Sequence, residues 1–184
     1  MKQARRKRCK SCNDIFEPRS SFQVTCSPKC AYEYIKTKEG QSVIAEERRK
    51  ENRKAKEALK PLSKLRQEAQ TAFNAFIRER DKGKSCISCG RNHQGQWHAG
   101  HYRSVGAAPE LRFEELNCHR QCMPCNAHKS GNLVEYRINL TKKIGLDAVE
   151  WLEGPHESKH YSREDLIQIK KTYRKKLREL QNES

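Results

Sequence analysis

The segment QCMPCNAHKSGN, residues 121–132, separates Cys122 from Cys125 by two residues and places Asn126 directly after the second cysteine. A matching pair, Cys86 and Cys89, lies upstream in the segment CISCG. Two close cysteine pairs are the usual ligand set of a tetrahedral structural zinc ion. Residues 90–121 separate the pairs, so one ion would tie distant segments together and close an insert between them. We therefore expect a zinc-stapled core with its chemistry in this insert.

A second set of four cysteines lies near the N-terminus, at Cys9, Cys12, Cys26 and Cys30. It predicts another zinc ion. Because four thiolates leave no open coordination position, this ion is expected to support structure or DNA docking and not catalysis. Ser27 and Pro28 are typical of the cap and the first residue of a helix, which predicts that residues 31–40 continue as a helix.

The composition favours nucleic acid as the partner. The 184-residue chain carries 39 Lys and Arg against 23 Asp and Glu, a formal charge of +16, and its mean hydropathy is −1.08. Such a field concentrates polyanions, although charge that serves only solubility is the alternative. The cysteines lie in close pairs without a secretion signal, which favours metal ligation over disulfides. No apolar run reaches the length of a membrane span, so a cytoplasmic protein without membrane contact is expected.

The pattern along the chain predicts an α+β fold in four parts. Residues 1–40 form the small N-terminal four-cysteine zinc knuckle, and residues 41–60, rich in Ala, Glu, Lys and Arg, form a charged helical linker. Residues 61–140 form the core with the second zinc site, and residues 141–184 form C-terminal helices, the last one capped by Ser162. The linker charges are taken as a solvated helix face, with contact to a phosphate backbone as the alternative.

The core is predicted to contain a helix, a strand, a loop, a returning strand and another helix. Apolar residues at helical spacing predict the first helix over residues 63–80. Alternating aromatic and polar residues predict a strand over residues 96–103, and a second strand returns over residues 117–121 after a turn-rich loop. After the last cysteine pair, a helix is expected over residues 126–138, weakened in its early part by Gly131.

Three polar residues in and beside the insert have the order of a nuclease motif: His101, Asn117 and Asn126. Next to the CxxC pairs, this order resembles the HNH or ββα-metal nucleases, and in particular their endonuclease VII-like subset. The segments FNAFIRERD, AGHYRS, LRF, QCMPCNAHKSGNL and YR are similar to those of the NinG (Rap) recombination endonuclease family of lambdoid phages, over nearly the whole chain. The resemblance implies an HNH core that cleaves Holliday junctions and other branched DNA and leaves 5′-phosphate and 3′-hydroxyl ends.

The chemistry of these residues suits the roles that the resemblance implies. Hydrolysis of a phosphodiester needs a group that takes a proton from water, which the imidazole of His101 can do. Asn117 on the returning strand would orient the loop or the imidazole by hydrogen bonds. Asn126 would offer a neutral oxygen to a catalytic Mg²⁺ or Mn²⁺ beside the zinc clip. For His101, a half-buried ring with satisfied hydrogen bonds is the alternative.

His98 departs from the family pattern. Members of the family often have Asp-Ala-Gly-His where this chain has HAGH at residues 98–101, so His98 would replace a carboxylate metal ligand. Because imidazole favours transition metals, we expect Mn²⁺, Co²⁺ or Ni²⁺ to be accepted and Mg²⁺ to serve less well. For His98, too, a half-buried ring that binds no metal is the alternative.

Basic residues near the motif are candidate DNA contacts. Lys129 is the strongest candidate, because it would begin the helix beside Asn126, and Arg103 and Arg112 are further candidates for phosphate binding. Solvated surface charge is the alternative for all three.

Three other residues with reactive side chains, in the insert and beside it, are expected to have structural roles. His119 and His128 would bond local backbone, with phosphate contact as the alternative. Cys118 is required by neither zinc set and is expected to be a small buried apolar residue.

These features together predict a metal-dependent endodeoxyribonuclease of the HNH type that acts on branched DNA in phage recombination, in the cytoplasm of a bacterial host. Because a symmetric junction requires two cuts, a homodimer is expected. Two alternatives stay open. One is a zinc protein that binds DNA without cutting it, because His98 has displaced the carboxylate, and the other is an HNH nuclease that cuts linear duplex.

Overall fold

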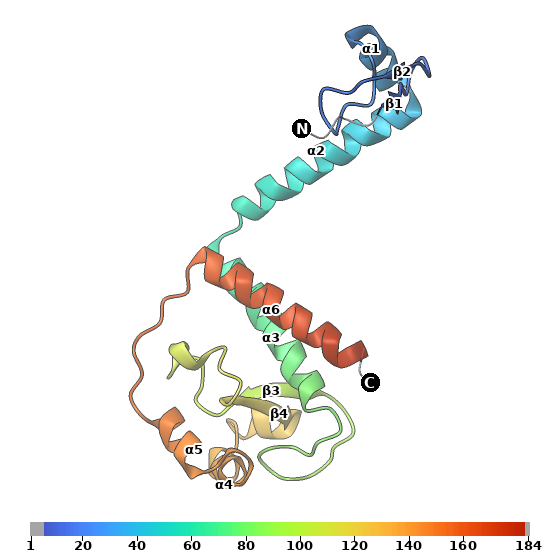
Figure 1. Cartoon of the computed structure of the whole chain (residues 1–184). Coiled ribbons are helices and arrows are strands. Elements are labelled where there is room, and N and C mark those ends of the chain that lie inside the picture. Colours follow the sequence, from blue (N-terminus) through green and yellow to red (C-terminus); the bar gives the residue numbers. More distant parts are fainter. Residues whose placement is uncertain (1–5, 183–184) are drawn as a thin grey trace. The chain divides into compact units, whose positions relative to one another are not determined.

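The computed structural model describes residues 6–182, and the chain divides into two compact units that meet at Lys60 and Pro61. The first unit contains β1 (Lys7–Arg8), β2 (Ile15–Phe16), α1 (Pro28–Lys36) and α2 (Lys38–Ala58). The second unit contains α3 (Leu62–Arg80), β3 (Trp97–His101), the 3₁₀ turn η1 (Pro109–Leu111), β4 (Cys118–Cys122), the π-helix η2 (Pro124–His128), α4 (Leu133–Ile144), α5 (Leu146–Glu153) and α6 (Arg163–Asn182). These elements form a mixed α+β fold with two small antiparallel sheets (Figure 1).

Capping side chains set the helices of the first unit. The Ser27 hydroxyl accepts a hydrogen bond from the backbone N of Cys30 at 3.2 Å, which confirms the predicted start of α1. The predicted continuation to residue 40 is interrupted, because α1 ends before Thr37, whose hydroxyl accepts from the backbone N of Gly40 at 3.1 Å and begins α2. A Cβ at Gly40 would lie 2.1 Å from the carbonyl oxygen of Tyr34, so only glycine fits this corner. The charged linker residues form the exposed body of α2.

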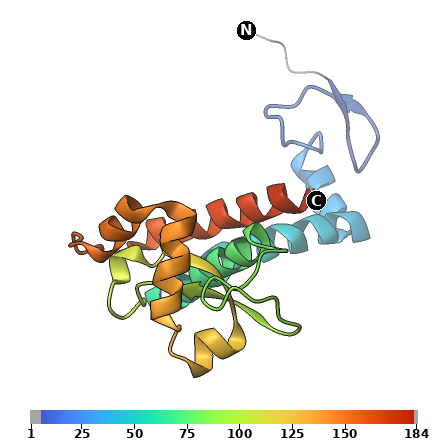
Figure 2. The same cartoon turned by 90° about the horizontal axis from the view of Figure 1, so that it is seen from below.

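Helices α3 and α6 lie side by side and provide much of the apolar packing of the second unit (Figures 1 and 2). The predicted helix over residues 63–80 is confirmed and begins one residue earlier. Phe73 of α3 packs edge-on against Tyr173 of α6, with ring centroids 4.8 Å apart. At the start of α6, Ser162 caps the helix as predicted, since its hydroxyl accepts from the backbone N of Asp165 at 3.1 Å.

Strands β3 and β4 form the antiparallel hairpin that the sequence predicts, with small shifts at the ends. The first strand is shorter than residues 96–103, and the second lies one residue later than residues 117–121. The register pairs His98 with Gln121 and His101 with Cys118. Because successive side chains of a strand point to opposite faces, His98 and His101 belong to different faces of the hairpin.

The hairpin lies between α3 and α4. On one face Ala99 and Cys118 pack in an apolar cluster with Phe73 of α3. On the other face the hydroxyl of Tyr136, a fully buried residue of α4, donates to the carbonyl oxygen of Gly100 at 2.9 Å. The two helices thereby fix the plane of the hairpin.

The predicted helix over residues 126–138 is wrong in its early part. The chain forms the short η2, and residues 130–132 then adopt φ values of 47°, 90° and 47° before α4 begins. The carbonyl oxygen of Gly131 accepts from Gln121 Nε2 at 2.5 Å and from Ser88 Oγ at 3.0 Å. These bonds come from residues distant in sequence and hold the chain in the left-handed region, so the local helical pattern does not reveal them.

Asp81, at the end of α3, joins several elements of the second unit. Its carboxylate is 1% exposed and contacts Arg80 Nη2 at 2.8 Å, Lys84 Nζ at 3.1 Å and Lys143 Nζ at 3.4 Å. It also accepts from the backbone N of Arg120 at 3.2 Å. Burial alone would raise the pKa of Asp81, but the hydrogen bond and charge of Arg80, with the charge of Lys143, lower that pKa well below its ordinary value. One carboxylate therefore connects α3, β4 and α4.

The Asp81→Asn substitution should lower the free energy of unfolding by about 3 kcal/mol at pH 7, because it leaves partly buried cations without their partner. Since the pKa of Asp81 is lowered in the folded protein, this contribution is complete above the ordinary carboxyl pKa of about 4 and is lost as the pH falls below it. Urea unfolding at neutral and acidic pH measures both effects. The exposed control Asp147→Asn should change stability by less than about 1 kcal/mol. Equal stability of wild type and Asp81→Asn at pH 7 would show that the Asp81 carboxylate does not stabilise the fold through its cation partners.

Candidate functional site

The sulfur atoms of four cysteines in the second unit converge, as the sequence predicts. The Sγ atoms of Cys86, Cys89, Cys122 and Cys125 lie within 4.8 Å of one another. Gly90 has a φ of 67° and donates its N–H to the carbonyl of Cys86 at 2.8 Å, and this tight turn directs the first pair toward the second. Four thiols in this arrangement suit zinc, so the group could hold one ion. The ion would join the loop after α3 to the end of β4 and to η2.

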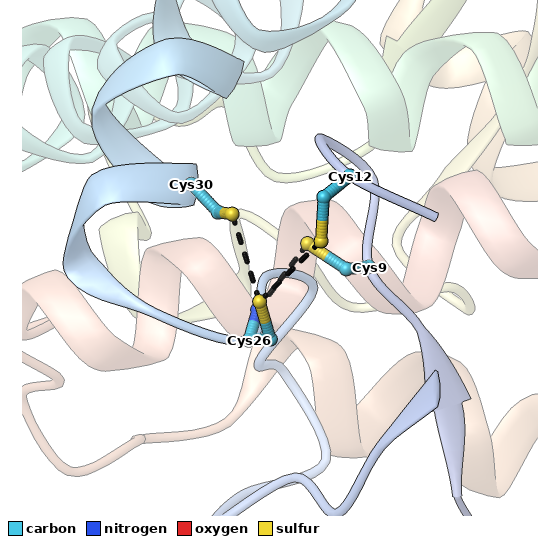
Figure 3. Close-up of side chains that lie close together, drawn as sticks. All are labelled: Cys9, Cys12, Cys26 and Cys30. Atoms are coloured by element: carbon cyan, nitrogen blue, oxygen red, sulfur yellow. Dashed lines mark hydrogen bonds between the residues drawn. The ribbon is translucent and has the colours of Figure 1, made fainter. Parts of the chain in front are cut away.

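The four cysteines of the first unit also converge, as the sticks in Figure 3 show. Cys26 Sγ lies 3.6 Å from Cys12 Sγ and 3.6 Å from Cys30 Sγ, and the backbone N of Cys26 donates to Cys9 Sγ at 3.3 Å. This group could hold a second zinc ion beside the start of α1. Within residues 6–182, no other group of three or more His, Cys, Asp or Glu brings its ligand atoms together.

A histidine that the sequence does not predict as part of the site lies beside the core cysteines. His93 Nε2 lies 3.2 Å from Cys89 Sγ, where a ring N–H would stabilise the thiolate of a zinc ligand. The only signal in the sequence is the close spacing of these two residues.

Trp97 packs against the same cysteine cluster, and the guanidinium of Arg120 lies 3.8 Å from the centroid of the Trp97 ring.

Asn126 lies on η2 directly after Cys125, so the cysteine cluster sets its position. Its side-chain amide lies 2.9 Å from Nδ1 of His98 on β3. The other ring nitrogen of His98, Nε2, is buried without a hydrogen-bond partner among the described residues. An imidazole nitrogen and an amide oxygen are compatible ligands for a divalent transition metal. The Asn126 amide nitrogen can only donate, so Nδ1 accepts this bond and the neutral ring carries its proton on Nε2, which would have to lose that proton to bind a metal.

His101 is held at the end of β3 by backbone and ring contacts. Its Nε2 lies 2.9 Å from the carbonyl oxygen of Arg112, which can only accept, so Nε2 carries the proton and Nδ1 keeps a lone pair. The ring packs on Phe73 with centroids 5.9 Å apart. Burial lowers the pKa of His101 below its ordinary value, although the hydrogen bond to Arg112 opposes this shift. The ring is therefore neutral at pH 7, with its lone pair on Nδ1, and the Sγ of Cys118 lies 3.7 Å from that nitrogen.

Asn117 is fully buried and clamps the loop that connects the two strands. Its Oδ1 accepts from the backbone N of Arg103 at 2.8 Å. Its Nδ2 donates to the carbonyl oxygen of Arg103 at 3.0 Å and to that of Leu111 at 3.2 Å. Asn117 therefore orients the loop and not the imidazole, because its side chain bonds the backbone of Arg103 and Leu111 and makes no hydrogen bond to the ring of His101.

His101 and Asn126 line one cavity of about 480 Å³. The strand β3, the loop after it and the turn between η2 and α4 form its walls, and they contribute Ala99, Tyr102, Arg103, Ser104, Val105, Ala107, Ser130, Gly131 and Leu133. The N-terminus of α4 has no side-chain cap, so its unpaired backbone N–H groups favour an anion at this end of the cavity. His98 contacts Asn126 but does not line the cavity.

The predicted DNA contacts occupy different environments. Arg103 lines the cavity, and its Nη1 donates to the carbonyl oxygens of Glu153 at 3.0 Å and Leu152 at 3.4 Å at the end of α5. Arg112 does not line the cavity, and its side chain donates to Gln70 Oε1 of α3 at 3.2 Å. Lys129 is exposed after η2 and does not line the cavity. The helix that Lys129 was expected to begin starts four residues later.

The remaining candidates have structural environments. His119 is buried, its Nδ1 lies 3.3 Å from the Tyr136 hydroxyl, and burial lowers its pKa to about 3. His128 is exposed and lies 3.1 Å from Met123 Sδ. Cys118 is fully buried, and burial raises the pKa of its thiol, as a small apolar residue requires. Its Sγ also lies 3.7 Å from Nδ1 of His101, a contact that the sequence does not predict.

These features define a basic α+β protein with two four-cysteine groups that could hold zinc and with a cavity beside a β-hairpin that His101, Arg103 and Asn126 line together with apolar residues. The family model described as Bacteriophage Lambda NinG protein matches residues 1–183. The chain therefore belongs to the NinG family, which confirms that part of the resemblance.

Several phage proteins are similar to the chain over almost its whole length. Protein ninG of Salmonella phage P22 is 44% identical, with 99% of this chain and 97% of the relative aligned. Protein ninG of Escherichia phage lambda is also 44% identical, over 96% of this chain and 94% of the relative. No solved structure matches the chain. None of the helices in the described part of the chain is long and apolar enough to cross a membrane.

Purified protein should contain about two zinc ions per chain, one for each four-cysteine group. Cys9→Ser and Cys125→Ser should each lower the content to about one ion, because three thiolates hold zinc less tightly than four. Plasma mass spectrometry of the dialysed proteins measures the content. Cys118→Ala, which changes a cysteine outside both groups, should keep both ions. Retention of two ions by Cys125→Ser would show that the core group is not a zinc site.

Proposed function

We propose that this protein is a metal-dependent endonuclease of the HNH type that cleaves Holliday junctions and other branched DNA during phage recombination in the bacterial cytoplasm. The observation that carries the proposal is that His101 and Asn126 line the same cavity. Asn117 clamps the wall of that cavity, and the chain has a formal charge of +16 that attracts DNA. The order of these three residues matches the nuclease motif described above.

In the proposed reaction, His101 acts as the general base. Its neutral ring accepts a proton from a water molecule at Nδ1, and the oxygen of that water attacks the phosphorus of the scissile phosphodiester. The bond from phosphorus to the 3′ oxygen breaks, and the leaving oxygen takes a proton from solvent. The products are a 3′-hydroxyl and a 5′-phosphate. The Arg112 carbonyl keeps the proton on Nε2 and so keeps the lone pair on Nδ1.

Asn126 and His98 would hold the catalytic divalent ion. Their side chains are in contact at 2.9 Å, and Nε2 of His98 is buried without a partner in the described structure. To hold the ion, His98 would release the proton from Nε2 and Asn126 would offer its Oδ1. When bound, the ion supplies positive charge to the phosphate oxygens on which negative charge increases. The uncapped end of α4 and the charge of Arg103, which also line the cavity, would bind the same phosphate. A two-fold dimer would provide the two cuts that a symmetric junction requires.

A second function is favoured by one observation. The His98 ring is hydrogen-bonded to Asn126, and an imidazole stands where the family pattern has a carboxylate. If this pair excludes the ion, the protein would bind branched DNA through its positive charge without cutting it. A nuclease that cuts linear duplex is a third possibility, and the choice of substrate separates it from the first.

The test is cleavage of a labelled four-way junction in Mn²⁺ and in Mg²⁺, with a linear duplex of the same sequence as comparison. The wild type should cut the junction near its branch point, and His101→Ala should lower the rate at least about 100-fold. His160→Ala, which removes an exposed histidine outside the cavity, should leave the rate unchanged. Because the pKa of His101 is lowered, the rate should fall on acidification with a midpoint below about 6.5. Junction binding without cleavage in either metal would favour the second function. Cleavage at the wild-type rate by His101→Ala would reject the role of His101 as general base.

The His98→Asp substitution should shift the metal preference from Mn²⁺ toward Mg²⁺, because a carboxylate oxygen suits the harder ion. We expect the ratio of the cleavage rate in Mg²⁺ to that in Mn²⁺ to rise about tenfold. Rates at saturating metal and junction DNA measure this ratio, with His98→Ala as the variant that removes the ligand. An unchanged ratio in both variants would show that His98 does not contact the ion.

A further inference from the structure

A second cavity, of about 420 Å³, lies at the outer edge of β4 beside the core cysteine group. The knuckle residues 84–87 and 90 form one wall, and Asn139 and Lys143 of α4 form another. The edge of β4 is closed here by the backbone N of Ile87, which donates to the carbonyl oxygen of Arg120 at 3.1 Å. This cavity shares no residue with the one that contains His101 and Asn126.

The charge at this cavity is not balanced. Lys84 and Lys143 both reach the same oxygen of Asp81, at 3.1 Å and 3.4 Å, and Arg80 pairs with the other oxygen at 2.8 Å. Arg120 adds a fourth cation that has no carboxylate partner among the described contacts. Three of these cations, Lys84, Arg120 and Lys143, line the cavity with the single carboxylate of Asp81, and an anion entering the cavity would reduce their mutual repulsion.

The cations are held in place and remain accessible. The guanidinium of Arg120 donates to the carbonyl oxygens of Asp81 and Lys84, each at 3.3 Å, and lies 3.8 Å from the centroid of the Trp97 ring. The side chains of Lys84 and Lys143 are 57% and 32% exposed, so their remaining N–H donors can reach a ligand. Fixed donors lose little freedom when they bind, which favours recognition of a compact anion.

We infer that this cavity binds a backbone phosphate of DNA at a position separate from the phosphate that is cut. The inference rests on the proposed action on DNA, and it requires only that DNA binds, not that it is cleaved. Lys84 and Lys143 would contact the phosphate oxygens directly, while Arg120 would contribute charge from a fixed position. A free phosphate ion has the same chemistry, so the experiment must separate the two sources.

The experiment measures binding of a fluorescent four-way junction by anisotropy at several salt concentrations, in a His101→Ala background without added divalent ions so that no cleavage occurs. Adding Lys84→Gln and Lys143→Gln together should weaken binding about tenfold and reduce the slope of log K against log salt by about one. The control is Lys142→Gln, an exposed lysine on the same helix that does not line the cavity. It removes one positive charge without removing a cavity contact, so a loss of less than about threefold is expected.

Each single variant, Lys84→Gln and Lys143→Gln, should weaken binding more than Lys142→Gln does, and circular dichroism should confirm that all of them are folded. Junction binding by the double variant equal to that of the control would overturn the inference. If inorganic phosphate raises the melting temperature of the wild type only, while junction binding is unaffected, the cavity binds a free anion and the assignment to DNA is wrong. If the wild type cuts no DNA but the double variant still binds the junction more weakly than the control, the proposed nuclease would be rejected and this inference would stand.

Discussion

The convergence of four cysteine sulfurs at the end of the hairpin is the constraint on which the rest of the second unit depends. Cys86 and Cys89 come from the loop after α3, while Cys122 and Cys125 end β4 and continue into η2. An ion bound here fixes the backbone on both sides of β4. Asn126 follows the last of these cysteines directly, so metal–sulfur bonds at this group would set its position relative to β3.

Buried polar side chains complete what the cysteines begin. The chain has a mean hydropathy of −1.08, and its apolar residues form several small clusters in place of one large core. Asn117, Gln121 and Asp81 are almost fully buried, and each bonds backbone or side-chain groups of other segments. Such bonds are directional, so they fix a loop more closely than apolar contacts of similar strength do. Asn117 fixes the loop after β3, and Gln121 holds the left-handed turn before α4.

The sequence predicts those parts of the fold that depend on local pattern. The helix over residues 63–80, the cap at Ser162, the two strands and the convergence of both cysteine sets follow from spacing that neighbouring residues determine. The turn at residues 130–132 and the contact of His93 with Cys89 are not predicted, because partners distant in sequence or a single turn geometry decide them. The sequence does not predict the environment of Arg103 either, since its carbonyl partner Glu153 lies at the end of α5, far along the chain. Which cavity residues would act on a substrate is likewise not fixed by pattern, because it depends on what binds in the cavity.

The strand register adds a condition that the motif alone does not contain. His98 and His101 lie on opposite faces of β3, so they cannot meet one ion or one phosphate through their own strand. Asn126 is the residue that connects them, because it bonds His98 and also lines the cavity with His101. A small shift of η2 would therefore separate His101, the proposed base, from Asn126, the proposed metal ligand, without moving either strand. The core zinc ion would prevent that shift, and for this reason a closed structural metal site, which offers no position to substrate, would still control the chemistry beside it.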